Sequence, residues 1–453
     1  MTAREIAYDV LKRWKPRSPH VAKALDEWFS RTELAASERA LANELVHGVI
    51  RRRDTLSAVL KPHVNRPLSH VESGALTLLW LGAYQLVMLS GIPPYAVVHE
   101  TLELAKQSGN PQWGGFINAV LRSLARAVTD EFAALPAANA VPLAAGRFRV
   151  VQGEPFPDPS QDWLGYFVAA FSFPRWLPER WQARFSRDEL LQMGFWFNTP
   201  AKMCLRVNRL RTTRDELLAV LEAASVKASA GTPPDAVWLE ESAFVQKVPG
   251  FAEGWFAVQD ESAISAASLL DPQPGERVLD LCAAPGGKTT HLAALMKNEG
   301  RILATDVDRD RLRRVEESCR RMGASIVETR VVPRDAVDFP GETFDRILLD
   351  VPCSNTGVLG KRPEVRWRLR MEDIVELAGI QTRLLQSACA HLIPGGRLVY
   401  STCSIEPEEN RAVVDRVLSE RPEMTLIREI HHNPGQPADG GYQALLERDS
   451  GVQ

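Results

Sequence analysis

Cysteine is scarce in this 453-residue chain, which carries only six. No two of them form a C-x-x-C pair, so a zinc knuckle or a redox dithiol has little support, and we expect no metal site. The six are Cys204, Cys282, Cys319, Cys353, Cys389 and Cys403. Scattered unpaired cysteines are typical of proteins in a reducing compartment. We therefore expect free thiols that serve either packing or chemistry.

The chain also lacks an excess of positive charge and a long uninterrupted apolar run. Its formal net charge is −3 and its pI is about 6.4, so any binding to nucleic acid has to depend on local patches. The segment Ser73–Val98 is uncharged, but Gly82 and the Gly91–Pro94 turn interrupt it before the roughly 20 apolar residues of a membrane span. The first residues, MTAREIAYDVLKRW, predict a charged amphipathic helix instead of a signal peptide. We expect a buried core helix, no membrane partner and a cytoplasmic protein.

Helical spacing dominates the first part of the chain, from Ala3 to about Ala127. Ile6, Val10 and Leu11 share one helical face, and Ser37 is a candidate N-cap for a later helix. An all-helical bundle is predicted here. At roughly 150 residues per domain, the full length predicts two to three domains.

The middle of the chain has a different composition. Residues 129–162 are rich in Ala, Pro and Gly, which predicts a linker with one short strand at Phe148–Val151. Residues 203–239 then read as strand, helix and strand, with Thr213 and Glu216 as a capping box, and predict a smaller α/β unit.

From about Trp255 onward, strands and helices alternate, which predicts a parallel sheet with crossover helices. The candidate strands after the first are Arg301–Thr305, Ile326–Val331, Arg346–Leu349 and Arg397–Tyr400. We divide the chain into residues 1–145 (helical bundle and start of the linker), 146–250 (linker and small α/β domain) and 251–453 (the large α/β domain).

The most informative stretch is Val278–Met296, VLDLCAAPGGKTTHLAALM. An apolar run ends at Asp280, a Pro-Gly-Gly turn follows, and a helical pattern begins, so strand, tight turn and helix are predicted. Such a turn presents backbone N–H groups and the positive end of a helix to a ligand. A P-loop would need glycine at Cys282, and the dinucleotide motif G-x-G-x-x-G is absent. S-adenosylmethionine (SAM) is the ligand that remains, with an ordinary tight turn as the alternative.

Acidic residues follow several of the predicted strands. Ligands bind beyond the carboxyl ends of strands in open α/β sheets, so Asp280, Asp306, Asp335, Asp350 and Cys403 should gather along one rim. Asp306 stands where a nucleoside-binding fold places the acid that accepts from ribose hydroxyls. Asp335 is placed to meet an adenine amino group. Together these acids favour a ligand that contains adenosine.

The segment Asp350–Cys353, DVPC, departs from the [DN]-P-P-[YF] motif of amino-group methyltransferases and puts a thiol in its place. A thiol suits C5 of cytosine, which is not nucleophilic enough to take a methyl group unaided. A thiolate that adds to C6 turns the ring into an enamine, C5 attacks the methyl group, and loss of the C5 proton expels the enzyme. A nucleophilic cysteine is therefore expected, and these residues alone do not choose between Cys353 and Cys403.

The motifs CAAPGGKTT, DVPCSNTGVL and YSTCSIEPEEN resemble those of the RNA cytosine-5 methyltransferases of the NOL1/NOP2/Sun class. The N-terminal pieces SERALANELVHGVIRRRDTL, IPPYAVVHETLELAK and GGFINAVLRSL resemble the NusB-like RNA-binding fold and occur in that family's order. The resemblance covers nearly the whole chain. It implies a NusB-like bundle, a small RRM-like α/β domain and a Rossmann-like SAM-dependent methyltransferase domain that acts on bacterial small-subunit (16S) rRNA. Separately from the resemblance, we expect a monomer.

The resemblance also implies roles for individual residues. Cys403 would be the nucleophile, Cys353 would assist release of the methylated base, and Asp350 would contact the base or SAM. The residues implied for SAM binding are Cys282, Ala283, Ala284, Pro285, Gly286, Gly287, Lys288, Asp306, Asp335 and Asp350. For RNA phosphates we favour the basic residues beside the catalytic motif, which are Lys361, Arg362, Arg366, Arg368 and Arg370.

Two departures from the family pattern and two alternatives stay open. Asn355 stands where the family usually has glycine, and the C-terminal segment DGGYQALLERDSGVQ predicts a short or frayed last strand. The same chemistry on transfer RNA or DNA is one alternative. The other is an RNA-binding or assembly factor whose methyltransferase half has lost activity. Arg206, Arg209, Arg211 and Arg214 form a second candidate surface for a nucleic-acid backbone.

Overall fold

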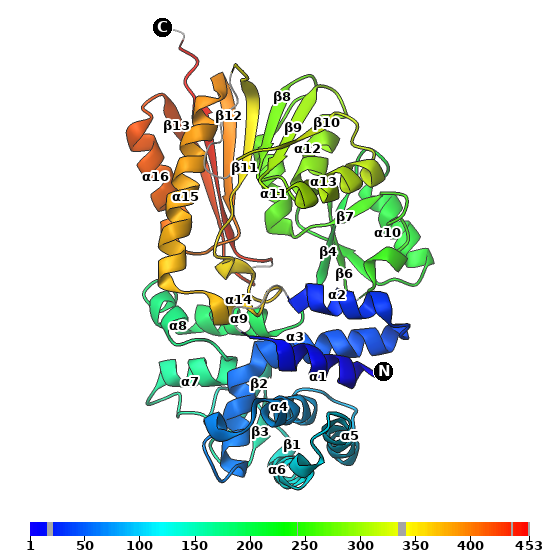
Figure 1. Ribbon diagram of the computed structural model, residues 1–453. Coiled ribbons are helices and arrows are strands. Elements are labelled where there is room, and N and C mark those ends of the chain that lie inside the picture. Colours follow the sequence, from blue (N-terminus) through cyan, green and yellow to red (C-terminus); the bar gives the residue numbers. More distant parts are fainter. Residues whose placement is uncertain (16–20, 242, 334–340, 436–437, 452–453) are drawn as a thin grey trace. The chain divides into compact units, whose positions relative to one another are not determined.

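The computed structural model describes residues 1–15, 21–241, 243–333, 341–435 and 438–451 (Figure 1). The chain forms two compact units. Unit 1 contains Met1–Ala201 and the short later segment Leu359–Arg368, and unit 2 contains Lys202–Val358 and Leu369–Gln453. Unit 1 is therefore discontinuous in sequence.

The first part of unit 1 is helical, as predicted. Its helices are α1 (Ala3–Arg13), α2 (Val21–Arg31), α3 (Ala36–Leu60), α4 (Ser73–Val87), α5 (Pro94–Gln107) and α6 (Gly114–Ala127), with 3-10 turns η1 (Lys61–His63), η2 (Leu68–His70) and η3 (Pro111–Trp113). Ser37 is not the N-cap of α3: the helix begins one residue earlier, at Ala36, after Ala35.

Helix α4 is the buried core helix expected from the uncharged segment. It is buried on nearly all sides, and Gly82 allows close packing, because a Cβ atom there would lie 2.5 Å from Cδ1 of Leu121 on α6. Among the described residues, no helix is both long enough and apolar enough to cross a membrane.

The predicted linker is more ordered than its composition indicated. It contains an antiparallel sheet of β1 (Val128–Ala133), β2 (Ala140–Ala144) and β3 (Arg147–Val151), in the order β1-β3-β2. Only β3 was expected. Strand β2 was not predicted because Pro142 interrupts its apolar run. Proline is tolerated there because β2 lies at an edge of the sheet. Helices α7 (Trp163–Phe171), α8 (Trp176–Trp181), α9 (Arg187–Asn198) and α14 (Val365–Arg368) complete unit 1.

Unit 2 begins with a small antiparallel sheet in the order β5-β6-β4-β7. Its elements are β4 (Met203–Val207), α10 (Arg214–Ala223), β5 (Ala228–Ala230), β6 (Ala236–Leu239), η4 (Val245–Lys247) and β7 (Phe256–Val258). The Thr213–Glu216 capping box predicted for α10 is present, because the Thr213 hydroxyl accepts from the Glu216 N–H and the Glu216 carboxylate accepts from the Thr213 N–H.

The large sheet of unit 2 has the order β10-β9-β8-β11-β12-β14-β13. The first five strands in this order are parallel, and β14 is antiparallel to both of its neighbours, β12 and β13. Its strands are β8 (Arg277–Leu281), β9 (Arg301–Asp306), β10 (Val327–Val331), β11 (Phe344–Asp350), β12 (Leu392–Thr402), β13 (Met424–His432) and β14 (Gly441–Arg448). The helices are α11 (Glu261–Leu270), α12 (Gly287–Leu295), α13 (Arg309–Met322), α15 (Met371–Ala390) and α16 (Arg411–Glu420), with η5 (Thr356–Val358) and η6 (Pro407–Glu409).

Helices cover both faces of this sheet, α11 to α13 on one face and α15 and α16 on the other (Figure 1). The alternation of β8 shows why: Val278 packs in the cluster with the α12 and α13 side chains, whereas Leu279 and Leu281 pack with those of α15 and α16. Strands buried on both faces read as continuous apolar runs, which is how they were found in the sequence.

The last strand is neither short nor frayed, contrary to the expectation from sequence. β14 pairs with β13 from Gly441 to Arg448 and with β12 over six residues. Gly441 permits this pairing, because a Cβ there would lie 2.7 Å from the carbonyl oxygen of Thr402. The glycine that weakened the prediction is thus a close-approach residue.

Candidate active site

The turn between β8 and α12 has the backbone shape that a ligand-binding turn requires. Cys282 and Gly286 have positive φ angles of 67° and 98°, and a Cβ at Gly286 would lie 3.0 Å from Cα of Val315. Burial raises the pKa of Cys282 to about 12, so this thiol stays neutral. Cys282 therefore contributes its backbone conformation to the turn and not a thiolate.

Three acids gather at the carboxyl ends of adjacent strands, as expected. Asp306 and Asp350 are the last residues of β9 and β11, and Asp280 is one residue before the end of β8. These strands lie in the order β9-β8-β11. Cys403 follows β12, the next strand in the sheet. Asp335, predicted for the same rim, lies outside the described residues.

Several buried acceptors on this rim have no hydrogen-bond partner within the described part of the chain. They are Oδ1 of Asp280, Oγ1 of Thr305 and Oδ2 of Asp306. The other oxygens are occupied: Asp280 Oδ2 accepts from the Thr289 hydroxyl at 2.6 Å, and Asp306 Oδ1 pairs with Arg311 at 3.2 Å. Buried polar atoms are rarely left unpaired, so these acceptors fit a ligand that brings donors. Ribose hydroxyls and the ammonium group of SAM are such donors.

An open pocket of about 650 Å³ adjoins the same rim. It is lined by Val307, Asp308, Arg309, Arg311, Val331, Val332 and Pro333, which follow β9 and end β10. Its lining combines four apolar side chains with three charged ones. The described part of the rim therefore has unpaired acceptors with an open pocket next to them.

Lys288 and Asp350 form an ion pair at 2.7 Å beside this turn. Burial disfavours the lysine cation, but the Asp350 carboxylate outweighs it and raises the pKa of Lys288, and the charge of Cys403 acts in the same direction. The sequence does not reveal this pair, because the two residues are 62 positions apart and Lys288 stands out there only as part of the cofactor turn.

The two cysteines of the DVPC and STCS motifs meet. Sγ of Cys353 lies 3.1 Å from Sγ of Cys403, although the residues are 50 positions apart. They follow β11 and β12, which run side by side with Asp350 opposite Ser401. The hydrogen bond with Cys403 and burial raise the pKa of Cys353 well above its usual value, so Cys353 is a neutral thiol.

Asn355 supports this cysteine pair. Its φ of 62° is the left-handed conformation that glycine provides elsewhere, and asparagine tolerates it better than most residues. Its amide donates to the carbonyl oxygen of Cys353 at 2.7 Å, and its Oδ1 accepts from Sγ of Cys403 at 3.3 Å. The departure from glycine therefore keeps the backbone and adds two contacts.

Glu409 was quoted within the third motif but received no role from the sequence. The side chain is fully buried and accepts from the N–H of Ser354 at 2.8 Å, from the Ser404 hydroxyl at 2.5 Å and from Gln381 at 3.0 Å. The hydroxyl of Ser354 also donates to it. Burial raises the pKa of Glu409, against the effect of these hydrogen bonds. The sequence gives no sign of this role, because the burial of Glu409 and its contacts with Ser354 and Ser404 appear only in the structure.

One predicted RNA contact is wrong. Arg366 is fully buried, and its guanidinium donates to carbonyl oxygens at the C-terminal ends of α7 and α9. The acceptors are the backbone carbonyls of Arg51, Phe171, Ser172, Phe197 and Leu359, together with Oδ1 of Asn198. Carbonyls at helix C-termini carry partial negative charge, which stabilises the buried guanidinium.

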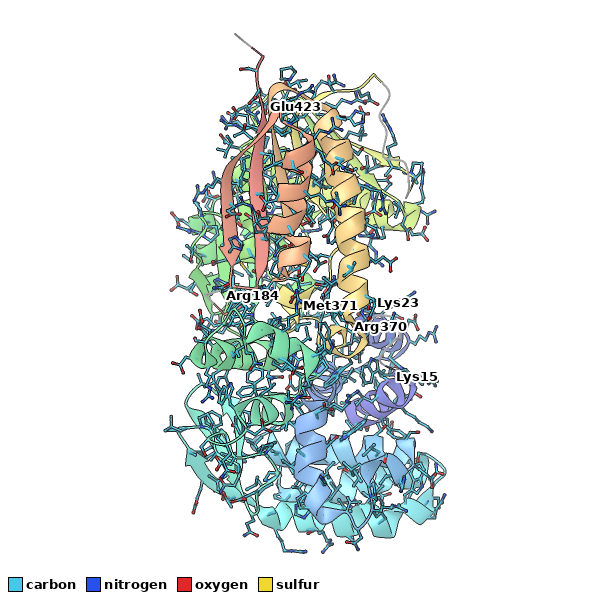
Figure 2. The ribbon with its side chains drawn as sticks, turned by 90° about the vertical axis from the view of Figure 1, so that its left-hand side faces the viewer. Lys15, Lys23, Arg184, Arg370, Met371 and Glu423 are labelled. Atoms are coloured by element: carbon cyan, nitrogen blue, oxygen red, sulfur yellow. The ribbon has the colours of Figure 1, made fainter. Side chains whose placement is uncertain are left out.

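The other basic candidates retain exposed surface. Lys361 and Arg362 are exposed and Arg368 is partly buried. Arg370 lies just before α15, at the N-terminal end of that helix (Figure 2), and pairs with Asp373 at 3.3 Å. Arg206, from the second candidate surface, is fully buried and therefore does not contact RNA.

The remaining cysteines, Cys204, Cys319 and Cys389, are buried in the core, and the structure contains them as free thiols. In the part of the chain that the structure describes, no three His, Cys, Asp or Glu side chains come together to hold a metal ion.

Comparison with protein families divides the chain into three parts. A family described as 16S rRNA methyltransferase RsmB/F matches residues 267–446. The NusB family matches residues 1–126, and a ferredoxin-like domain of RsmF/B-like methyltransferases matches residues 173–246. These matches confirm the expected fold classes, since RRM-like and ferredoxin-like describe the same arrangement of a small α/β domain.

Whole-chain relatives agree with this division. Ribosomal RNA small subunit methyltransferase B of Salmonella dublin is 37% identical over 429 residues, which is 92% of this chain and 90% of that protein. The crystal structure of PH0851 matches with a TM-score of 0.76 and 27% identity over 99% of both chains. A methyltransferase homologue from Pyrococcus horikoshii matches with a TM-score of 0.56 and 28% identity, over 62% of this chain and 97% of that one. The chain therefore belongs to the 16S rRNA methyltransferase RsmB/F family, in which SAM is the methyl donor.

Proposed function

We propose that this protein transfers a methyl group from SAM to C5 of a cytidine in bacterial 16S rRNA, through a covalent bond between Cys403 and C6 of the base. The observation that carries the proposal is the pair of thiols 3.1 Å apart at the end of β11 and β12, beside an acidic rim with unpaired acceptors. Family membership supports the RNA substrate.

The two cysteines have different tasks in this proposal. The Cys403 thiolate forms a bond to C6 and makes C5 nucleophilic, and C5 then takes the methyl group. Loss of the C5 proton returns an electron pair to the ring, which breaks the bond between sulfur and C6. Cys353 assists this release, since a neutral thiol next to the adduct can exchange protons there. The Lys288 ammonium attracts the Cys403 thiolate, the same interaction that contributes to the raised pKa of Lys288.

SAM supplies an electrophilic methyl group when it is bound. We assign its binding to the turn from Cys282 to Lys288, to Asp306 with its unpaired Oδ2, and to Asp335 and Asp350. Within the turn, Ala283, Ala284, Pro285, Gly286 and Gly287 act through their backbone. Asp350 has a second task, because its side chain is about one-third exposed and can accept from the target base.

The target base has to leave the RNA stack before it reaches the thiols, which costs a few kcal/mol. Lys361, Arg362, Arg368 and Arg370 can offset this cost through phosphate contacts. We place the protein in the bacterial cytoplasm with its rRNA substrate, and we propose a monomer, because one chain supplies both thiols and the acidic rim. The domain limits 1–145, 146–250 and 251–453 are part of the same proposal.

Covalent trapping tests the mechanism. Bacterial 16S rRNA that contains 5-fluorocytidine is incubated with SAM and wild type, Cys403→Ala or Cys353→Ala, and the adduct is resolved by denaturing electrophoresis. Fluorine cannot leave as the proton does, so we expect a stable adduct that requires Cys403. On ordinary RNA, Cys353→Ala should accumulate an adduct because release is slow.

Controls separate the alternatives. Transfer RNA and single-stranded DNA with the same fluorinated base should trap at least tenfold less enzyme if 16S rRNA is the substrate. If the wild type binds 16S rRNA and SAM but forms no adduct, the cysteine mechanism is wrong. The alternative, an RNA-binding factor without methyltransferase activity, would then be favoured. Failure to bind SAM would lead to the same conclusion.

A further inference from the structure

The most densely hydrogen-bonded carboxylate near the thiols does not belong to the cofactor rim. Glu409 is fully buried and lies in the loop of residues 403–410, which we call the Cys403 loop. Its carboxylate accepts from donors on two loops: Ser404, next to Cys403, and Ser354, next to Cys353. Residues 351–358 form the second loop, the Cys353 loop. One side chain thus holds the immediate neighbours of both thiols.

Further hydrogen bonds join the same two loops. The N–H of Gly357 donates to the carbonyl oxygen of Cys403 at 3.0 Å, and the hydroxyls of Thr356 and Ser404 lie 3.1 Å apart. Gln381 on α15 donates from one amide nitrogen both to Glu409 at 3.0 Å and to the carbonyl oxygen of Pro352 at 2.9 Å. Each of these bonds limits how far Cys353 can move away from Cys403.

The donors around Glu409 require an acceptor and not a particular charge. One carboxylate oxygen accepts from the Ser354 N–H and from Gln381, which can only donate there, and the other faces the hydroxyls of Ser354 and Ser404. Hydroxyl groups rotate and can accept as well as donate. A glutamine at position 409 can therefore keep all four contacts, with Oε1 toward the two N–H donors and its amide toward the serines. An alanine keeps none.

We propose that Glu409 is a positioning residue, which holds the Cys353 and Cys403 loops together so that both thiols meet the same base. This inference rests on the proposed function, in which one thiol binds C6 while the other assists release. Misplacement of a reacting group by about 1 Å can cost roughly 10²-fold in rate. Loss of the Glu409 contacts should therefore separate the thiols and slow methyl transfer without removing either cysteine.

The thiol separation can be measured without RNA or SAM. Diamide oxidises two neighbouring thiols to a disulfide: the thiols give up two electrons and two protons, and diamide becomes the hydrazine. Thiols already 3.1 Å apart need little movement to form this bond. The initial rate of the Cys353–Cys403 disulfide, followed by peptide mass spectrometry at fixed pH, reports their proximity.

We expect Glu409→Ala to form this disulfide at least about tenfold more slowly than wild type and to transfer methyl groups about 10²-fold more slowly in a single turnover. Glu409→Gln should recover most of the disulfide rate and lose only about threefold in methyl transfer. SAM affinity should stay within about twofold in both. The matched control is Asp415→Ala, which removes an exposed carboxylate from α16 and should leave all readouts unchanged.

Two results would overturn the proposal. Disulfide and methyl-transfer rates of Glu409→Ala within twofold of wild type would remove any positioning role. A Glu409→Gln variant as inactive as Glu409→Ala, with a wild-type disulfide rate, would show that the charge of Glu409 matters and its hydrogen bonds do not. Ser404→Ala, which removes one contact, should slow disulfide formation to an intermediate extent and serves if Glu409→Ala does not fold. Because the disulfide assay uses no substrate, it stands even if 16S rRNA is the wrong substrate.

Discussion

Asn355 illustrates how one residue can satisfy a backbone constraint and a chemical one together. Its left-handed φ is open to glycine and, at lower cost than for other residues, to asparagine. Its side chain then contacts both cysteine residues of the site. From the sequence the substitution looked like a threat to the loop, because neither the φ angle nor the contact with Cys403 can be seen there.

Asn355→Gly and Asn355→Val separate the two tasks. Glycine keeps the backbone and loses both side-chain bonds, so we expect little change in stability and a roughly tenfold loss in methyl transfer. Valine cannot easily adopt this φ and should also destabilise unit 2 by about 1–2 kcal/mol. Thermal unfolding and single-turnover methyl transfer measure the two effects. If the glycine variant is as active as wild type, the contact with Cys403 has no catalytic use.

The buried carboxyl group of Asp280 should make the free energy of unfolding of the ligand-free protein depend on pH. Burial raises its pKa from 3.8 to about 7 in the folded state. Between those values the unfolded state loses its proton first, so wild type loses stability as pH rises through this range. Asp280→Asn cannot titrate and should gain stability relative to wild type between pH 4 and pH 7, by up to about 4 kcal/mol. Melting temperatures without SAM at pH 4.5, 6 and 8 test this expectation, with Asp415→Asn as control. Parallel curves for Asp280→Asn and wild type would contradict it.

At the scale of elements, the parallel strands were predictable and the small antiparallel sheet of unit 1 was not. Strands β8, β9, β11 and β12 are buried on both faces, so their apolar runs stand out in the sequence. Strands β1 and β2 are both short. β1 (VTDEFA) contains two adjacent acidic residues and β2 (AVPLA) has a proline in an edge position, so no local pattern separates them from a linker. The pairing of β14 likewise depended on its neighbours in the sheet, which local composition does not reveal.

Arg206 connects the small sheet to the cofactor turn. From β4 its guanidinium donates to Gln259 at 2.8 Å, to the Thr290 hydroxyl at 2.9 Å and to the carbonyl oxygen of Gly287 at 3.3 Å. Burial lowers its pKa to about 9, so it is still a cation at neutral pH. Through these hydrogen bonds the small sheet of unit 2 holds the first turn of α12 in place.

Arg206→Met should weaken SAM binding by about tenfold and destabilise the protein by about 3 kcal/mol, since hydrogen bonds to a charged group contribute about 1.5–3 kcal/mol each. Calorimetric titration with SAM and thermal unfolding measure both. The control is Arg214→Gln, from the same arginine cluster, which donates to the carbonyls of Gly231 and Pro233 and should bind SAM normally. Equal SAM affinity in the two variants would rule out this support.

At the scale of the whole molecule, the sequence predicted that acids and cysteines gather on one rim of the sheet. It did not predict that residues 359–368 belong to unit 1. Five basic residues between Lys361 and Arg370 look alike in the sequence. Only the fold shows that Arg366 is enclosed by carbonyls from α3, α7 and α9, which lie 169 to 315 positions earlier in the chain. The local charge predicted that all five side chains lie on an RNA-binding surface, but tertiary packing buries Arg366 inside unit 1.

Arg366→Met and Arg362→Gln should therefore behave in opposite ways. The first leaves buried carbonyls unpaired and should destabilise unit 1 by at least about 3 kcal/mol. The second should leave stability within about 0.5 kcal/mol but reduce the slope of log affinity against log salt by about 0.7 to 0.9, the share of one phosphate contact. Thermal unfolding and RNA titration at several salt concentrations test both. An unchanged slope for Arg362→Gln would remove it from the RNA surface.

The discontinuity of unit 1 also has a consequence for how the protein is made. When Ala201 leaves the ribosome, every acceptor of Arg366 except the carbonyl of Leu359 has been synthesised, but Arg366 itself is 165 residues away. At about 5–20 residues per second, translation of that interval takes roughly 10–30 s. Until strands β8 to β11 have been synthesised, the carbonyls of unit 1 that accept from Arg366 lack this donor. The maturation of unit 1 during translation is tied to the half of the protein that performs the chemistry.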